Sequence, residues 1–211
     1  MAMNRPFYCI TRDLHLYLGL FLAPFILVFS VSALFLVHSW MPGRKPLPGP
    51  PRAVPNLALP ENLESLGGRA RVDALQAALP QLGVSGEIGS VRHIAKQRRL
   101  VFPVSVPGSE TTIDMSLATR SATVTRRDTG LWDGLVTLHK APGQHLAGIR
   151  GNWLPMRAWG WLADGTVYLL FFISASGVYL WTVLRAERGP GLALLAAGAL
   201  SFMGIVYAVV H

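Results

Sequence analysis

Three long stretches without a charged side chain dominate the pattern of polar and apolar positions along this chain. They cover residues 14–40, 166–184 and 191–211, and each is rich in Leu, Val, Phe and Ala. An α-helix of about 20 apolar residues crosses the ~30 Å hydrocarbon layer of a bilayer. The sequence therefore predicts three transmembrane helices, the last two joined by a short turn over residues 185–190.

The first stretch follows an N-terminal segment, residues 1–13, that carries Arg5 and Arg12. Its apolar length exceeds the about 7–15 residues of a signal peptide, and no small-residue cleavage site ends it, so we expect a retained anchor. Lysine and arginine near helix ends favour the cytoplasm. Together with Arg185 and Arg188, these arginines predict a cytoplasmic N-terminus and turn, with residues 41–165 on the periplasmic side.

The polar part of the chain begins with residues 41–60, whose seven prolines predict a stiff, extended segment rather than a folded element. Within residues 61–130, helical spacing of apolar side chains predicts a helix over 69–79. Bounded apolar and alternating stretches predict strands over 91–95, 100–106, 111–117 and 122–126. We expect an α+β membrane protein: three transmembrane helices, with one helix on a small antiparallel sheet between the first and the second.

Residues 131–165 are too polar to cross a bilayer and too aromatic for a simple linker. Leu131, Leu135 and Leu138 share one helical face, which predicts a short helix lying in the membrane interface. Tryptophan also prefers the level of the lipid head groups. We assign to the interface Trp40, Trp153, Trp159, Trp161 and Trp181.

Composition excludes several classes of protein. Only 14% of the residues are charged, against about 25% in soluble domains, and the abundant apolar residues argue against disorder. Cys9 is the single cysteine, which excludes a disulfide scaffold. The net charge of +8 comes from scattered basic residues without a nucleic-acid motif. It favours attraction to anionic lipid head groups or to an acidic partner protein.

Three stretches carry a resemblance to a known family. They are Arg-Asp-Leu-His at 12–15 with His38 beyond it, residues 123–130 at the end of the predicted domain, and Leu-His-Lys at 138–140 followed by residues 174–181. In this order they resemble the PepSY-associated transmembrane family. The resemblance implies a periplasmic PepSY domain in a bacterial inner-membrane protein. Some larger relatives look like haem-containing reductases of iron complexes, from which this chain departs in having three spans and few intramembrane histidines.

The positions of the histidines indicate where this chain could bind a haem. A b-type haem takes axial ligands, usually two histidines on facing helices at one depth. His15 lies near the predicted inner boundary without a histidine partner there. Four others lie near the outer boundary, where any two are candidate ligands of one haem b at the periplasmic face: His38, His139, His145 and His211. The competing interpretation makes them interfacial polar residues, and on that interpretation we expect no cofactor.

The sequence lacks the motifs of common metal-binding and catalytic sites. The sequence has no paired cysteines, no His-x-x-x-His and no carboxylate cluster, so we expect neither a metal site nor enzymatic activity. Small residues, in contrast, recur on one face of the third apolar stretch and permit helix backbones to approach closely. The residues assigned to helix packing are Ala193, Ala197, Ser201 and Gly204, with Ser174 and Gly177 in the second stretch.

These observations predict a non-catalytic accessory or scaffolding subunit of a larger bacterial inner-membrane assembly. Its partners would be other membrane subunits and the lipid bilayer, and not nucleic acid. Analogy with the redox role of the relatives suggests an energy-converting host, respiratory or photosynthetic. Two alternatives stay open: a small electron carrier with one b-type haem, and a membrane-tethered PepSY module that binds or regulates other molecules.

Overall fold

The structure, a computed structural model, describes residues 5–38, 47–140, 148–183 and 188–210. Its contacts divide the chain into two compact units. The first, which we call the helical unit, comprises Met1–Phe25 and Gly165–His211; the second, the sheet unit, comprises Ile26–Asp164. Each unit is described by itself.

Three helices in the described part of the chain are long and apolar enough to cross a membrane, as the sequence predicts. They are α1 (Arg5–His38), α4 (Leu154–Val183) and α5 (Arg188–Val210). Both α1 and α4 begin before the uncharged stretches that the sequence shows. The chain is therefore a membrane protein of the α+β class.

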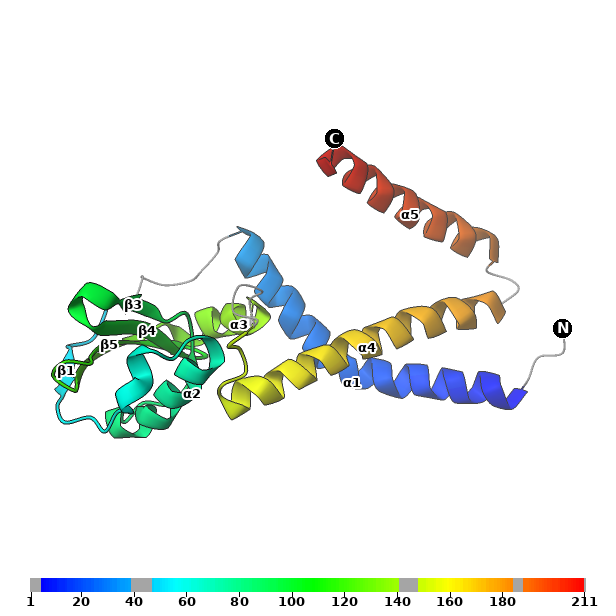
Figure 1. The fold of residues 1–211 in the computed structure, drawn as a ribbon. Coiled ribbons are helices and arrows are strands. Elements are labelled where there is room, and N and C mark those ends of the chain that lie inside the picture. Colours follow the sequence, from blue (N-terminus) through cyan, green and yellow to red (C-terminus); the bar gives the residue numbers. More distant parts are fainter. Residues whose placement is uncertain (1–4, 39–46, 141–147, 184–187, 211) are drawn as a thin grey trace. The chain divides into compact units, whose positions relative to one another are not determined.

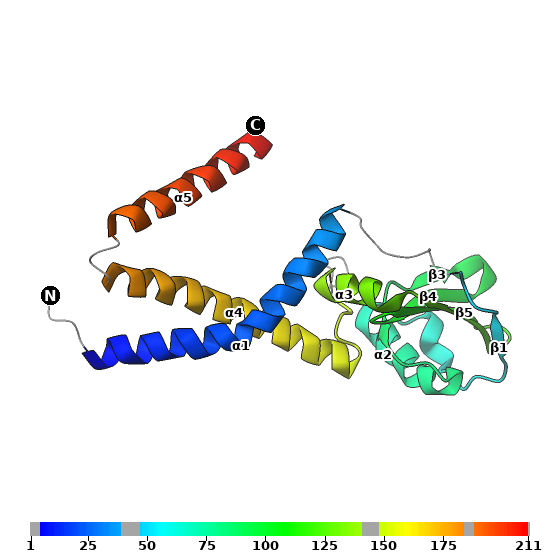
Figure 2. The same cartoon turned by 180° about the vertical axis from the view of Figure 1, so that it is seen from behind.

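In the helical unit, α1 and α4 run antiparallel and side by side (Figures 1 and 2). The rings of Phe7 and Tyr179 lie 5.4 Å apart, and His15 contacts Ser176 further along the pair. Leu22 of α1 is completely buried. The antiparallel pairing follows from these contacts, since residue numbers rise along α1 while those of their partners fall along α4.

Helix α1 passes through Pro24 without ending. Proline has no backbone N–H, so the helix loses one hydrogen bond at this position, a defect that neighbouring helices compensate inside membranes. The boundary between the two units falls directly after it, between Phe25 and Ile26.

The sheet unit contains one antiparallel sheet with the strand order β1-β6-β5-β4-β2, and β3 also pairs with β4. The long central strands match the predicted ones. The apolar side chains of β5 alternate with polar ones, so that one face of the sheet is buried. The strands are β1 (Arg52–Val54), β2 (Glu87–Ile88), β3 (Arg92–Ile94), β4 (Arg99–Val106), β5 (Ser109–Ser116) and β6 (Ser121–Asp128).

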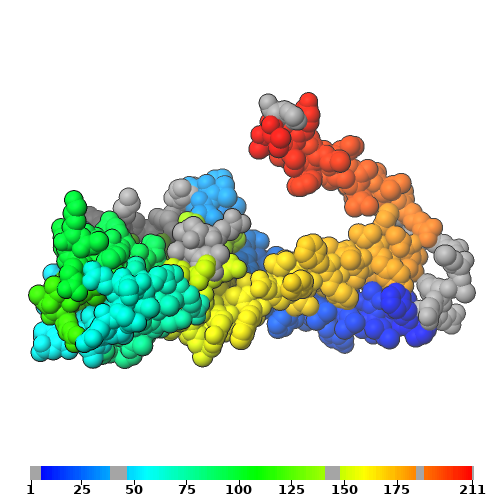
Figure 3. All heavy atoms as spheres, viewed as in Figure 1, coloured from blue at the N-terminus to red at the C-terminus, as the bar shows by residue number. Residues whose placement is uncertain are grey.

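A helical layer covers the buried face of this sheet. It consists of η1 (Glu61–Glu64), α2 (Gly68–Ala78) and η2 (Leu79–Leu82). In the space-filling view these cyan segments lie over the green strands (Figure 3). Phe102 is the largest completely buried side chain between the layers, and Leu75 of α2 is also fully buried. The predicted helix over 69–79 thus forms, and its apolar face packs on the sheet.

One prediction about the proline-rich segment is wrong. Residues 52–54, predicted to lie outside any folded element, form the edge strand β1 and pair with β6. The Gly49 amide donates to the Arg126 carbonyl at 2.7 Å, which continues the pairing beyond the strand. Pro51 and Pro55 flank the three strand residues, and proline is tolerated at an edge strand because its outer side needs no hydrogen-bond donor.

The short helix predicted after the sheet is α3 (Gly130–Lys140). The amides of Thr129 and Gly130 donate to the carbonyl of Gly108 in the β4–β5 turn. A Cβ at Gly134 would lie 2.8 Å from the Gly108 nitrogen, so α3 approaches the turn closely only because this residue is glycine. Leu131, expected on the apolar face, is 72% exposed, while Val136 is buried.

Candidate functional site

The sheet and helix α4 meet at a junction formed by Glu87 of β2. One carboxylate oxygen, Oε1, accepts hydrogen bonds from the backbone amides of Gly151 at 2.6 Å and Asn152 at 3.3 Å. The other, Oε2, accepts from the amide of Trp153 at 2.8 Å. These amides directly precede α4, whose first-turn N–H groups lack partners within the helix. A carboxylate at a helix N-terminus is also stabilised by the helix dipole.

Asn152 completes the junction with its side-chain amide. Its Oδ1 accepts from the Ile88 amide at 2.9 Å, and its Nδ2 donates at 2.9 Å to the carbonyls of both Ile88 and Ile149. Asn152 therefore pairs with β2 as a further strand residue would. Together with Glu87 it fixes the start of a membrane-crossing helix on the sheet.

A second contact in the sheet unit connects α1 with α3. The Ser32 hydroxyl, only 2% exposed, donates to the Phe29 carbonyl at 2.8 Å and lies 3.1 Å from Nδ1 of His139. This distance places the Ser32 hydroxyl and the His139 imidazole within hydrogen-bond reach of each other. The histidine ring also lies 5.6 Å from the Phe29 ring, and Trp159 Nε1 donates to the Leu138 carbonyl.

A matching contact joins α1 and α4 in the helical unit. Nδ1 of His15 lies 2.8 Å from the Ser176 hydroxyl, which donates to the Ile173 carbonyl at 3.2 Å. A Cβ at Gly177 would lie 3.4 Å from Cε1 of His15, an ordinary van der Waals distance, so the imidazole packs against α4 at this glycine. No histidine in the sequence is a candidate partner for His15 at this depth, and in the structure its partner is a serine.

The four histidines proposed as haem ligands can be compared with these positions. His145 and His211 lie outside the described residues. Ser32, which holds His139, and His38 are six residues apart on α1, about 9 Å along the axis and on different sides of the helix. The proposed pairs of haem ligands therefore stay a prediction.

Helix α5 differs from α1 and α4 because no residue in its described range is buried. The small residues assigned to packing, Ala193, Ala197, Ser201 and Gly204, are therefore all exposed in this structure. Ser174 of α4 is also exposed, whereas Gly177 is half-buried against His15.

The tryptophans assigned to the interface fall into different surroundings. Trp40 lies outside the described residues, and Trp153 and Trp181 are half-buried. Trp159 packs at 5.8 Å from Phe29 in the sheet unit. Trp161 is 67% exposed, with the guanidinium of Arg157 5.9 Å from its ring centre.

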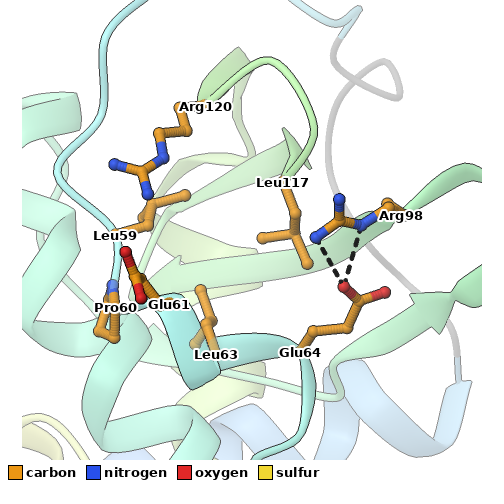
Figure 4. A pocket seen from close by; sticks show the side chains of 8 residues that line it. All are labelled: Leu59, Pro60, Glu61, Leu63, Glu64, Arg98, Leu117 and Arg120. Atoms are coloured by element: carbon orange, nitrogen blue, oxygen red, sulfur yellow. Dashed lines mark hydrogen bonds and ion pairs between the residues drawn. The ribbon is translucent and has the colours of Figure 1, made fainter.

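The sheet and the helical layer of η1, α2 and η2 together form what we call the sheet domain. A pocket of about 220 Å³ opens on this domain, lined by apolar side chains such as Leu63 and by charged ones at its rim (Figure 4). Arg98 donates to Glu64 at 3.0 Å, and Nε2 of His93 lies 3.6 Å from the other Glu64 oxygen. Arg98 and Arg120 have the positive φ angles of 47° and 48°. Both belong to the turns between strands, which explains these angles without a ligand.

On the opposite face of the sheet, Arg99 forms an ion pair with Asp114 of the neighbouring strand. The hydrogen bond and the negative charge of this carboxylate raise the pKa of Arg99 above its usual value. Within the described part of the chain, no three His, Cys, Asp or Glu side chains gather as metal ligands would. Cys9 is exposed near the start of α1.

Comparisons of the chain with protein-family models, with curated proteins and with solved structures found no match.

Proposed function

We propose that this chain is a non-catalytic accessory subunit of a larger membrane assembly, in which its helices contact other subunits and its sheet domain braces them. The observation that carries the proposal is the exposure of α5. A complete membrane-crossing helix of 23 residues has no buried residue in its described range.

The composition of α5 favours another helix over lipid as its neighbour. Ala193, Ala197 and Ser201 recur at every fourth position, and Gly204 continues the same face. Lipid chains cover bulky side chains as well as small ones, but small residues specifically permit two helix backbones to come close. A transmembrane helix of a partner subunit therefore fits this face.

The junction supports the bracing role of the sheet domain. Three amides bound by Glu87, and the strand-like pairing of Asn152 with Ile88, hold the sheet on the first residues of α4. A domain on a flexible tether has no defined direction relative to its membrane helix. The junction instead holds this domain on the start of α4, so a partner can contact the sheet and the first turns of α4 together.

The membrane and the orientation are also part of the proposal. The antiparallel pairing of α1 with α4 brings the end of α1 that carries Arg12 to the end of α4 that precedes Arg188. These charges favour the cytoplasmic side, with the sheet domain in the periplasm of a bacterial cell. The resemblance to the PepSY-associated transmembrane family agrees with this location and with an energy-converting host complex.

The test is co-purification of the tagged full chain from its native membranes in a mild detergent. We expect other membrane subunits in fixed stoichiometry with the wild-type protein, and their loss in Ala197→Leu, which fills the small-residue face. Ala199→Leu adds the same side chain about 200° around the helix and should leave the partners bound. A wild-type chain that purifies alone, or equal loss in both variants, would contradict the proposal.

A further inference from the structure

A second pocket in the sheet unit lies where α2 meets the first turns of α4. Its volume is about 500 Å³, and its walls come from the start of α2, from residues 150–151 and from one face of α4 between 156 and 164. Three arginines line it, Arg69, Arg150 and Arg157, together with Trp161 and a single carboxylate, Asp164. The pocket therefore carries an excess of positive charge.

Only one of the three guanidinium groups has its polar partners within the described part of the chain. Arg69 donates from Nε to Asp73 at 2.8 Å and from Nη1 to the Arg150 carbonyl at 3.1 Å. For the side chains of Arg150 and Arg157, both exposed, the structure shows no hydrogen bond and no ion pair among the described residues. Each guanidinium offers five N–H donors in a planar fork that matches the oxygens of a phosphate.

The length of α4 places this pocket at the level of the lipid head groups. Thirty residues form a helix of about 45 Å, which equals the thickness of a bilayer with both head-group layers. The uncharged part of α4 starts after Asp164 and is long enough for the hydrocarbon layer alone. Met156, Arg157 and Gly160 therefore lie in the head-group layer, and exposed Trp161 is the kind of residue found at this boundary.

We propose that this pocket binds the phosphate group of an anionic phospholipid. Arg150 and Arg157 supply the donors, Arg69 with its Asp73 partner forms one wall, and the Trp161 ring beside Arg157 contacts the upper acyl or glycerol carbons. A phospholipid with a cationic head group is less favoured, because its own positive charge meets Arg150 and Arg157, while Arg69 is already paired with Asp73 and Asp164 is the one carboxylate in the lining.

The test uses the full chain in nanodiscs of phosphatidylcholine with a minor fraction of phosphatidylglycerol, and native mass spectrometry counts the lipids that stay bound. We expect the wild type to retain phosphatidylglycerol preferentially. A basic residue near the membrane surface contributes about a fivefold preference, so Arg150→Gln with Arg157→Gln should reduce it about 30-fold. The control, Arg92→Gln with Arg120→Gln, removes the same two charges from exposed sites outside the pocket and should change little.

Three outcomes would overturn the proposal. The wild type could show no preference for phosphatidylglycerol, or both double variants could lose it equally, which would assign the effect to overall charge. In a third arm, the chain in neutral detergent is given inorganic phosphate. If inorganic phosphate binds, is not displaced by phosphatidylglycerol, and is lost in the Arg150→Gln, Arg157→Gln variant, the pocket is a site for soluble phosphate instead.

Discussion

The junction between sheet and membrane helix makes the sharpest prediction, which concerns Glu87→Gln. The glutamine keeps one carbonyl oxygen but replaces the other acceptor by an NH₂ group that faces a backbone N–H. The variant therefore loses either the bond to Trp153 or those to Gly151 and Asn152. A hydrogen bond to a charged group contributes about 1.5–3 kcal/mol, so we expect local opening of residues 149–153 to become easier by about this amount.

Hydrogen exchange of the full chain in detergent measures this opening directly. About 1.5–3 kcal/mol corresponds to amide exchange about 10- to 150-fold faster, confined to the segment that precedes α4 and to β2. The strands β4 to β6 should keep their protection because their pairing is unchanged. Glu61→Gln serves as the control, since it removes the same charge from an exposed residue of η1. Unchanged exchange of 149–153 in Glu87→Gln, or an equal effect in the control, would refute the assigned role of the junction.

Three further predictions concern packing. Phe102→Ala empties a completely buried site and should lower the free energy of unfolding of the sheet domain by about 3–5 kcal/mol, measured by urea denaturation in detergent. Gly134→Ala brings a Cβ to 2.8 Å from the Gly108 nitrogen and should cost about 1–3 kcal/mol in the same assay, whereas Gly160→Ala meets open space and should not destabilise. Ser176→Ala removes the partner of His15 and should weaken the α1–α4 pair by about 0.6 kcal/mol, at most about 1.7 kcal/mol. Unfolding in bicelles measures this change. The control, Ser174→Ala, lies at an exposed position and should leave the stability of the pair unchanged.

The elements that sequence reasoning found are those whose evidence is local. Long apolar stretches predict membrane helices, and the alternation around Ile113 and Met115 predicts β5, because each pattern repeats over several turns or residue pairs. The short strands β1 and β2 were missed for the same reason. With three residues in β1 and two in β2, neither strand is long enough to show an alternating pattern. Both strands form because β6 and β4 pair with them.

The junction could not be predicted because its parts are far apart in the sequence. Glu87 and the amides that it binds are separated by 64 to 66 residues, and a lone glutamate before an isoleucine has no distinguishing pattern. The histidines show a similar limit. His15 and His139 were judged by their distance from other histidines, whereas in the folded chain each is oriented by a serine hydroxyl.

These two histidine–serine contacts also explain how α1 selects its position against its neighbours. Positions 11, 15, 18, 22, 25, 29 and 32 form one stripe at alternating spacings of four and three, and none of them is exposed. Its middle is apolar, with Leu22 fully buried, while buried Thr11 and Ser32 occupy its ends. A shift of α1 by one heptad keeps the stripe aligned but separates both histidines from their serines. Apolar packing alone would tolerate that shift, so the polar contacts select the register of α1 with α4 in the helical unit and, separately, with α3 in the sheet unit.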